Sequence, residues 1–207
     1  MPNWCNNNIN IYGDESTIAT ITSVLKGLKS NDYVFQSLIG IPSHMSEADY
    51  KDKWYDTNIE WFGTKWDISA DEHAFTFGKE EISFFCETAW SPPIQFLENL
   101  CKMYKINAYI FYSEGGIGFA GQTDFIWTDG ELDINDQEYG YLEGLYILSE
   151  DEFWSEVDYQ ADCILDEDQS LENFLGIFPF VSEEHKEKLT TIYNETIKNK
   201  DEELEVE

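Results

Sequence analysis

The sequence predicts an α+β protein: a ferredoxin-like domain, in which two helices cover one face of an antiparallel sheet, followed by an acidic, mainly helical extension. Apolar residues alternate with polar ones in several short segments, as in half-buried strands. Between these segments lie two amphipathic helical patterns, giving the order strand, helix, strand, strand, helix, strand over residues 6–112. That order is the split βαβ arrangement of ferredoxin-like folds. After about residue 134 the strand pattern gives way to helical spacing.

The first strand and helix are indicated by clear periodicity. In residues 8–12, Ile9 and Ile11 lie on one face of a strand. Asp14 is placed to cap a helix that runs to Leu28, because aspartate oxygens accept hydrogen bonds from free N–H groups at a helix start. The apolar stripe of this helix consists of Ile18, Ile21, Leu25 and Leu28.

Residues 29–72 lose this periodicity and are largely polar, with an aromatic cluster at Trp54, Tyr55, Trp61, Phe62 and Trp66. We interpret this span as an insertion or long loop in the ferredoxin-like domain. A loop of this length without structure would be unusual, so part of it is expected to pack on the core.

The remaining elements of the domain follow in order. Segments 74–77 and 82–88 form a predicted hairpin, and Pro92-Pro93 opens the second helix, where a missing N–H costs nothing. Residues 107–112 are apolar throughout and indicate a strand buried on both faces. Two more strands, 117–121 and 125–128, are expected, the second pairing with 131–134 across Asp129-Gly130. We therefore place the domain at residues 1–134.

The extension, residues 135–207, is predicted to be helical. An acidic helix is expected at 150–165, and Ser170 and Ser182 are candidate N-caps for two more helices. Residues 201–207 (DEELEVE) indicate a frayed acidic tail.

Charge is the most unusual property of the chain. It has 42 Asp and Glu residues, 12 Lys and no Arg, for a net charge of −30. Residues 130–207 alone hold 24 acidic and four basic side chains, against 18 and eight in residues 1–129. A field of this sign repels nucleic acids and anionic membranes, so we expect no direct nucleic-acid or membrane binding. The expected partner is a basic protein, whereas the sequence leaves the oligomeric state open.

Other features narrow the class of protein. The first residues, MPNWCNNNIN, lack the basic and apolar regions of a signal peptide, and no apolar run approaches the ~20 residues of a membrane span. Four scattered cysteines without a CxxC pair indicate free thiols. None of the acidic runs has the spacing of an EF-hand loop. We therefore expect a cytoplasmic protein without a cofactor or dedicated metal site.

Four motifs occur in a fixed order: MPNWCNNNINIYG at the start, WFGTKWD at 61–67, ETAWSPP at 87–93 and YSEGGIGFAG at 112–121. Together they resemble the YubB-like ferredoxin-like family, also called Api92-like, over about residues 1–128. The resemblance implies a ferredoxin-like fold and a setting in phages, plasmids or related mobile elements. It implies no catalytic residues, and residues 130–207 lie outside it.

One group of residues could line a ligand pocket. Lys65 would attract an anion or pair with Asp67, and Trp66 would offer a stacking surface. The alternative is structural: the tryptophans clamp the insertion onto the sheet, Ser91 caps a helix, and Glu114 belongs to a turn at Gly115-Gly116. The candidate pocket residues are Trp61, Thr64, Lys65, Trp66, Asp67, Trp90 and Glu114.

The acidic extension suggests a second site. Helices that display carboxylates can imitate the phosphate spacing of DNA, which carries about one negative charge per 1.7 Å of axis. The alternative is a solvated acidic surface that keeps the protein soluble. We favour a non-enzymatic phage or plasmid protein that binds a basic, nucleic-acid-handling host defence protein as a DNA mimic; the second hypothesis is a small-ligand or enzymatic pocket. The candidate partner-binding residues are Glu150, Asp151, Glu152, Glu156, Asp158, Asp162, Asp166, Glu167, Asp168 and Glu172.

Overall fold

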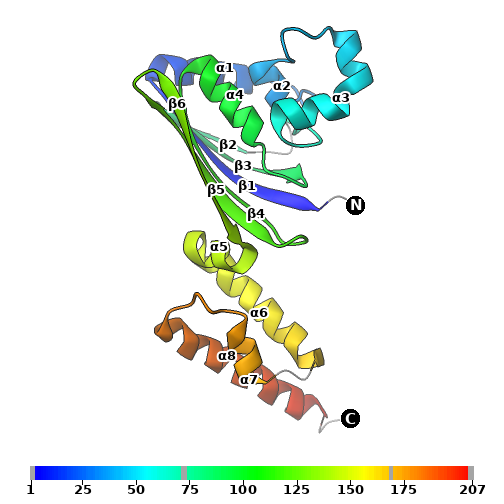
Figure 1. The fold of residues 1–207 in the computed structure, drawn as a ribbon, viewed down its shortest axis with the longest axis vertical. Coiled ribbons are helices and arrows are strands. Elements are labelled where there is room, and N and C mark those ends of the chain that lie inside the picture. Colours follow the sequence, from blue (N-terminus) through cyan, green and yellow to red (C-terminus); the bar gives the residue numbers. More distant parts are fainter. Residues whose placement is uncertain (1–2, 71–73, 168–169, 205–207) are drawn as a thin grey trace. The chain divides into compact units, whose positions relative to one another are not determined.

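The computed structural model describes residues 3–70, 74–167 and 170–204, which divide into two compact units, Met1–Tyr139 and Gly140–Glu207 (Figure 1). The strands of the first unit are β1 (Trp4–Tyr12), β2 (Phe75–Phe77), β3 (Glu81–Ala89), β4 (Asn107–Glu114), β5 (Phe119–Thr128) and β6 (Glu131–Gly140). Its helices are α1 (Glu15–Gly27), α2 (Val34–Ile39), α3 (Glu47–Phe62) and α4 (Ile94–Tyr104).

The six strands form one sheet in the order β2-β3-β1-β4-β5-β6. Strand β1 pairs antiparallel with both β3 and β4, and Ile9 lies opposite Phe84 on one side and Ile110 on the other. The first four strands, with α1 and α4, have the ferredoxin-like arrangement, and β5 and β6 extend the sheet. The predicted fold class is confirmed. Figure 1 shows α1 and α4 on the same face of the sheet.

Most strands are longer than predicted. Strand β1 begins at Trp4 because Asn7, although polar, is buried in the inward row with Cys5 and Ile9. The amide Nδ2 of Asn7 contacts the Cys5 carbonyl, the Cys86 carbonyl and Thr88 Oγ1 at 2.8, 3.1 and 2.9 Å, which offsets the cost of its burial. The predicted strands 117–121 and 125–128 are one strand, β5, and β6 continues to Gly140.

The core lies between the sheet and its helices. Ile18, Ile21 and Leu25 of α1 are buried, as their spacing predicts. Three phenylalanines from different helices meet at its centre: the ring of Phe35 lies 4.1 Å from Phe96 in a stacked arrangement and 5.8 Å from Phe62. Buried aromatic pairs of this kind stabilise a core beyond the area that they bury.

Residues 29–72, interpreted as an insertion or long loop of which part packs on the core, are not a loop without structure. This span holds α2 and α3, and α2 contacts both α1 and α4. Val34, Phe35, Leu38 and Ile39 of α2 are fully buried, so the segment belongs to the core. Helix α3 begins at a capping box, in which Ser46 and Asp49 exchange hydrogen bonds, and ends at Gly63 with φ 84°.

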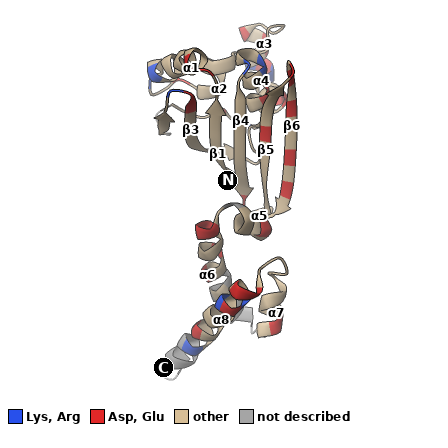
Figure 2. Ribbon diagram, turned by 90° about the vertical axis from the view of Figure 1, so that its left-hand side faces the viewer, with Lys and Arg blue, Asp and Glu red and all other residues tan. Residues whose placement is uncertain are grey.

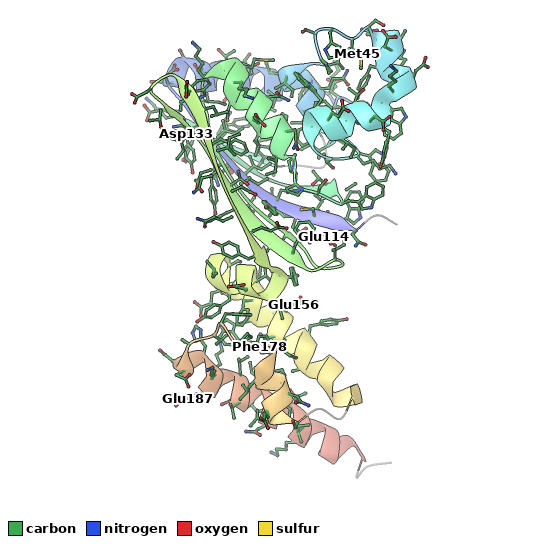
Figure 3. The ribbon with its side chains drawn as sticks, in the orientation of Figure 1. Met45, Glu114, Asp133, Glu156, Phe178 and Glu187 are labelled. Atoms are coloured by element: carbon green, nitrogen blue, oxygen red, sulfur yellow. The ribbon has the colours of Figure 1, made fainter. Side chains whose placement is uncertain are left out.

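The second unit has a core of its own. It contains α5 (Tyr141–Leu148), α6 (Glu150–Glu167), α7 (Leu171–Gly176) and α8 (Glu183–Leu204). Phe153 packs edge-on against Phe178, which in turn packs against Phe174; Figure 3 marks Phe178 among these helices. Ser170 and Ser182 accept hydrogen bonds from the N–H groups of Asn173 and His185, as expected of N-caps. Helix α8 extends to Leu204, so most of the predicted frayed tail is helical.

Candidate functional site

A cavity of about 970 Å³ lies in the first unit, where the end of β3 and the start of β1 meet α2 and α3. Sheet pairing creates one side of it, because Trp4 at the start of β1 lies opposite Ala89 at the end of β3. Its volume is at the upper end of the range of small-molecule sites. The aromatic side chains that line it are Trp4, Tyr33, Tyr50, Trp54, Trp66 and Phe85; the polar ones are Gln36, Asn58, Asp67, Ser69, Glu87 and Thr88.

The aromatic side chains that line the cavity form a wall that is partly exposed to solvent. Trp4, Tyr33 and Phe85 are 47%, 54% and 46% exposed, and Trp54 and Trp66 are each just under 40%. The rings of Trp4 and Trp66 lie 6.1 Å apart at 42°, so they form an angled pair. A concentration of exposed aromatic surface around a hollow is uncommon in a folded domain and marks a binding surface.

Asp67 forms the base of the cavity and also caps α2. Its Oδ1 accepts hydrogen bonds from the N–H groups of Phe35 and Ile68 at 2.8 and 2.7 Å, and its Oδ2 accepts from Gln36 at 2.7 Å. Burial raises the pKa of the carboxyl to about 6, although the three N–H donors act in the opposite direction. Asp67 is therefore ionised at neutral pH. The pKa of Tyr50 is raised mainly by burial of its hydroxyl group, and the negative charge of Asp67 raises it further.

A second carboxylate enters from the sheet. Glu87 of β3 is exposed and lines the cavity. It makes no hydrogen bond or ion pair with any residue that the structure describes. Among the described lining residues there is no Lys, Arg or His. The cavity thus combines aromatic faces with two negative charges.

Lys65 lies beside this wall but not on the cavity lining. Its Nζ is 4.4 Å from the centre of the Trp66 ring, 4.6 Å from Trp90 and 5.9 Å from Tyr55. The predicted Lys65–Asp67 pair is absent within the described part of the chain. The ammonium group is instead held by the electron-rich faces of aromatic rings.

Residues 65–157 match the family described as the ferredoxin-like domain in Api92-like protein. This stretch is therefore similar to Api92-like proteins. The family resemblance is therefore confirmed, whereas its predicted end near residue 128 was wrong, because the match continues to Val157. The matched part includes Lys65, Trp66, Asp67 and Glu87 of the cavity region. The chain is also similar to the crystal structure of a protein api92 from Yersinia pseudotuberculosis, with a TM-score of 0.43, 12% sequence identity, and coverage of 68% of this chain and 99% of that chain. No curated protein matches the sequence.

Of the seven predicted pocket residues, Trp66 and Asp67 line the cavity. Two others hold neighbouring segments together. Trp61 Nε1 donates to the carbonyl of Gly40 at 3.1 Å, and buried Thr64 donates through Oγ1 to the carbonyl of Ala89, also at 3.1 Å. These bonds fix the end of α3 against the turn after α2 and the end of β3.

Trp90 and Glu114 lie outside the lining. Trp90 has φ 72° and donates its backbone N–H to Asn3. Glu114, labelled in Figure 3, is buried at the end of β4 and accepts hydrogen bonds from the backbone N–H groups of Gly116 and Ile117 at 2.7 and 2.6 Å. It therefore stabilises the β4–β5 turn.

The acidic candidates lie on the helices of the second unit. Asp151, Glu152 and Asp158 are exposed on α6, and Glu172 is exposed on α7. Glu150 accepts a hydrogen bond from Trp154 Nε1 and lies 3.7 Å from His185 Nε2, and Glu156 accepts one from Tyr141. Asp162, Asp166 and Glu167 fall within α6, whereas Asp168 lies outside the described residues.

The sequence did not single out the exposed acidic positions of β6. Glu131, Asp133, Asp136 and Glu138 are all exposed on this strand, and Figure 2 shows acidic positions following it. Asp136 accepts hydrogen bonds from Thr123 at 2.5 Å and Tyr112 at 3.5 Å, and Gln122 of β5 bonds Gln137 of β6. The length of β6 was underestimated because its exposed side chains are nearly all polar.

None of the helices in the described ranges combines the length and the apolarity that crossing a membrane requires. Residues 3–70, 74–167 and 170–204 hold no group of three or more His, Cys, Asp or Glu side chains placed to share a metal ion.

Proposed function

We propose that the Api92-like domain of this protein is a small-molecule-binding module that holds its ligand in the aromatic cavity beside β3. The observation that carries the proposal is the half-exposed aromatic wall around a hollow of about 970 Å³. Leaving several large aromatic surfaces in contact with water is unfavourable by about 25 cal/mol per Å² of apolar area. A ligand that covers these faces recovers that free energy.

The side chains around the cavity favour binding over catalysis. Asp67 has three backbone donors on its two oxygens, so its role in positioning α2 limits its freedom to transfer protons. His44 and His185 are the histidines in the described residues, and neither lines the cavity. A nucleophile with an adjacent base, which covalent catalysis requires, is not present among the described lining residues.

A fragment screen with a matched pair of variants tests the proposal. Gln36 and Ser37 are both exposed on α2, but only Gln36 lines the cavity. Three of the seven tryptophans also line it, so intrinsic fluorescence reports occupancy. We expect Gln36→Trp to abolish the binding of compounds that wild type and Ser37→Trp bind equally. A screen in which no compound distinguishes the two variants would refute the proposed function.

A second candidate function rests on the acidic surface of the second unit. It follows from exposed Asp151 and Asp158, which lie seven residues apart on α6 and so about 10.5 Å apart along one helix face. On this proposal the protein acts in the host cytoplasm, is encoded by a phage or plasmid, and occupies the basic groove of a nucleic-acid-handling defence protein as a DNA mimic. The contact would be fast to form and sensitive to salt.

Charge reversal separates this candidate from a merely solvated surface. Replacing Asp151 and Asp158 by Lys is expected to release a basic partner captured at low salt. Replacing Glu131 and Asp133 of β6 by Lys changes the net charge equally and serves as the control. Equal loss in both variants would show a general charge effect, and no loss in either would exclude α6 as the contact.

A further inference from the structure

The charge of the cavity restricts the ligand class. Its two acidic lining residues, Asp67 and Glu87, are not balanced by any cationic lining residue that the structure describes. The whole chain carries a net charge of −30, so the long-range field has the same sign as the local one. Both fields raise the local concentration of cations and oppose the entry of anions.

The two carboxylates retain capacity to bind. Oδ1 of Asp67 accepts two hydrogen bonds and Oδ2 accepts one, which leaves one acceptor position on Oδ2. Glu87, which has no partner among the described residues, keeps all of its acceptor positions. A neutral or anionic ligand would leave these oxygens poorly satisfied once water is excluded, whereas a cationic ligand pairs with them.

Aromatic rings beside the cavity hold the ammonium group of Lys65. Lys65 Nζ lies over Trp66, which is also a wall of the cavity, and over Trp90. Lys65 forms no ion pair in the described residues, although acidic side chains are abundant in the chain. The rings of this region are therefore oriented so that a positive charge is stabilised at a π-face.

These three observations agree on one ligand class. We propose that the cavity binds a small organic cation, with its positive charge against the tryptophan faces and directed toward Glu87 and Asp67. This inference rests on the proposed ligand-binding function and adds to it the sign of the ligand's charge. The recognised chemistry is that of an alkylated ammonium or a guanidinium group on an organic body.

A pair of probes that differ only in charge tests the inference. Acetylcholine and 3,3-dimethylbutyl acetate have the same shape, but the first has a quaternary nitrogen where the second has carbon. Titration calorimetry on the full chain is expected to show acetylcholine binding on the order of tenfold more tightly, the effect of cation–π and carboxylate contacts together. Equal affinity for the two probes, or no binding of acetylcholine, would overturn the cation assignment.

A matched variant pair locates the charge effect. Glu87 and Glu81 lie on the same strand and face, about 20 Å apart at 3.4 Å per residue, and both are exposed. Glu87→Gln should reduce acetylcholine affinity several-fold more than that of the neutral probe, while Glu81→Gln, with the same change in net charge, should leave both affinities unchanged. Equal losses in the two variants would also overturn the assignment.

The outcomes separate this inference from the function on which it rests. If neutral fragments bind and Gln36→Trp blocks them while cations gain nothing, the module binds ligands and the cation assignment is wrong. If Gln36→Trp blocks no compound of any charge, the ligand-binding function itself fails.

Discussion

Replacing Asp67 by Asn tests the electrostatics of the cavity most directly. The substitution keeps the shape of the side chain but removes its charge and one of its two acceptor oxygens. Asp67 caps α2 through three backbone N–H groups while lining the cavity. The variant therefore loses hydrogen bonds, at about 1–3 kcal/mol for each donor left unsatisfied, a cost that does not depend on pH. The variant also has no ionised carboxylate to bury. In wild type the free-energy cost of that burial depends on pH.

The sign and size of the pH-dependent part follow from the pKa. Burial raises the pKa of Asp67 from 3.8 to about 6 in the folded protein. Between these values the folded state binds more protons than the unfolded state, so this group's contribution to stability is full below pH 4 and is lost as the pH rises to 6. A shift of this size corresponds to roughly 3 kcal/mol at 1.36 kcal/mol per pH unit.

Urea denaturation at several pH values measures the effect. Tryptophan fluorescence reports mainly on the first unit, which holds six of the seven tryptophans. The free energy of unfolding of wild type minus that of Asp67→Asn should fall by roughly 3 kcal/mol between pH 3 and pH 7, about two thirds of it between pH 4 and pH 6, and stay constant above pH 7. A flat difference would refute the shift in pKa. A difference that rises with pH would show that the three N–H donors outweigh burial and that the pKa is lowered.

Three further predictions concern stability. Asn7→Leu should destabilise the protein by about 3 kcal/mol or more, because it removes the hydrogen bonds that the buried amide donates to the carbonyls of Cys5 and Cys86 and to Thr88 Oγ1; equilibrium unfolding in urea measures this, and a change below 1 kcal/mol would contradict it. Gly63→Ala should cost roughly 1–3 kcal/mol, since φ is 84° there and the new Cβ would collide with Gln95 Oε1; an unchanged melting temperature would disagree. Residues 1–139 alone should unfold cooperatively and retain fragment binding, because their core contains no residue of the second unit. Calorimetry of the isolated unit measures both, and the absence of a cooperative unfolding transition would contradict the prediction.

The sequence was sufficient for the parts of the fold that have strong periodicity. The stripe of α1 and the alternation in β1 and β3 each bury one face, so the pattern and the structure have the same cause. Helix α3 was missed because only Thr57, Asn58 and Phe62 are buried along its sixteen residues, and two of these are polar. Its capping box at Ser46 and its terminal glycine were the readable signals. Helix α2 has six residues, too few to display a helical period.

The residues that line the cavity could be predicted only in part, because some of them are brought there by the pairing register of β1 with β3. Trp66 and Asp67 belong to a conspicuous aromatic motif, and both line the cavity. Trp4 reaches it because β1 pairs with β3 in the register that places Trp4 opposite Ala89. Tyr50 and Trp54 reach it because α3, which was not predicted, exists. No local pattern contains such information, since these residues are up to 85 positions apart in the chain.

In the WFGTKWD segment, residues that make structural contacts are direct neighbours of residues that line the cavity. The structural and the ligand-binding interpretations of this motif therefore do not exclude each other. Phe62 fills the core, Gly63 ends α3, and Thr64 binds the end of β3 through the carbonyl of Ala89. These contacts fix the backbone that then presents Trp66 and Asp67 to the cavity, and Asp67 in turn fixes the start of α2. A change at Thr64 should therefore weaken ligand binding without touching the ligand, because the wall it supports would no longer be held in place.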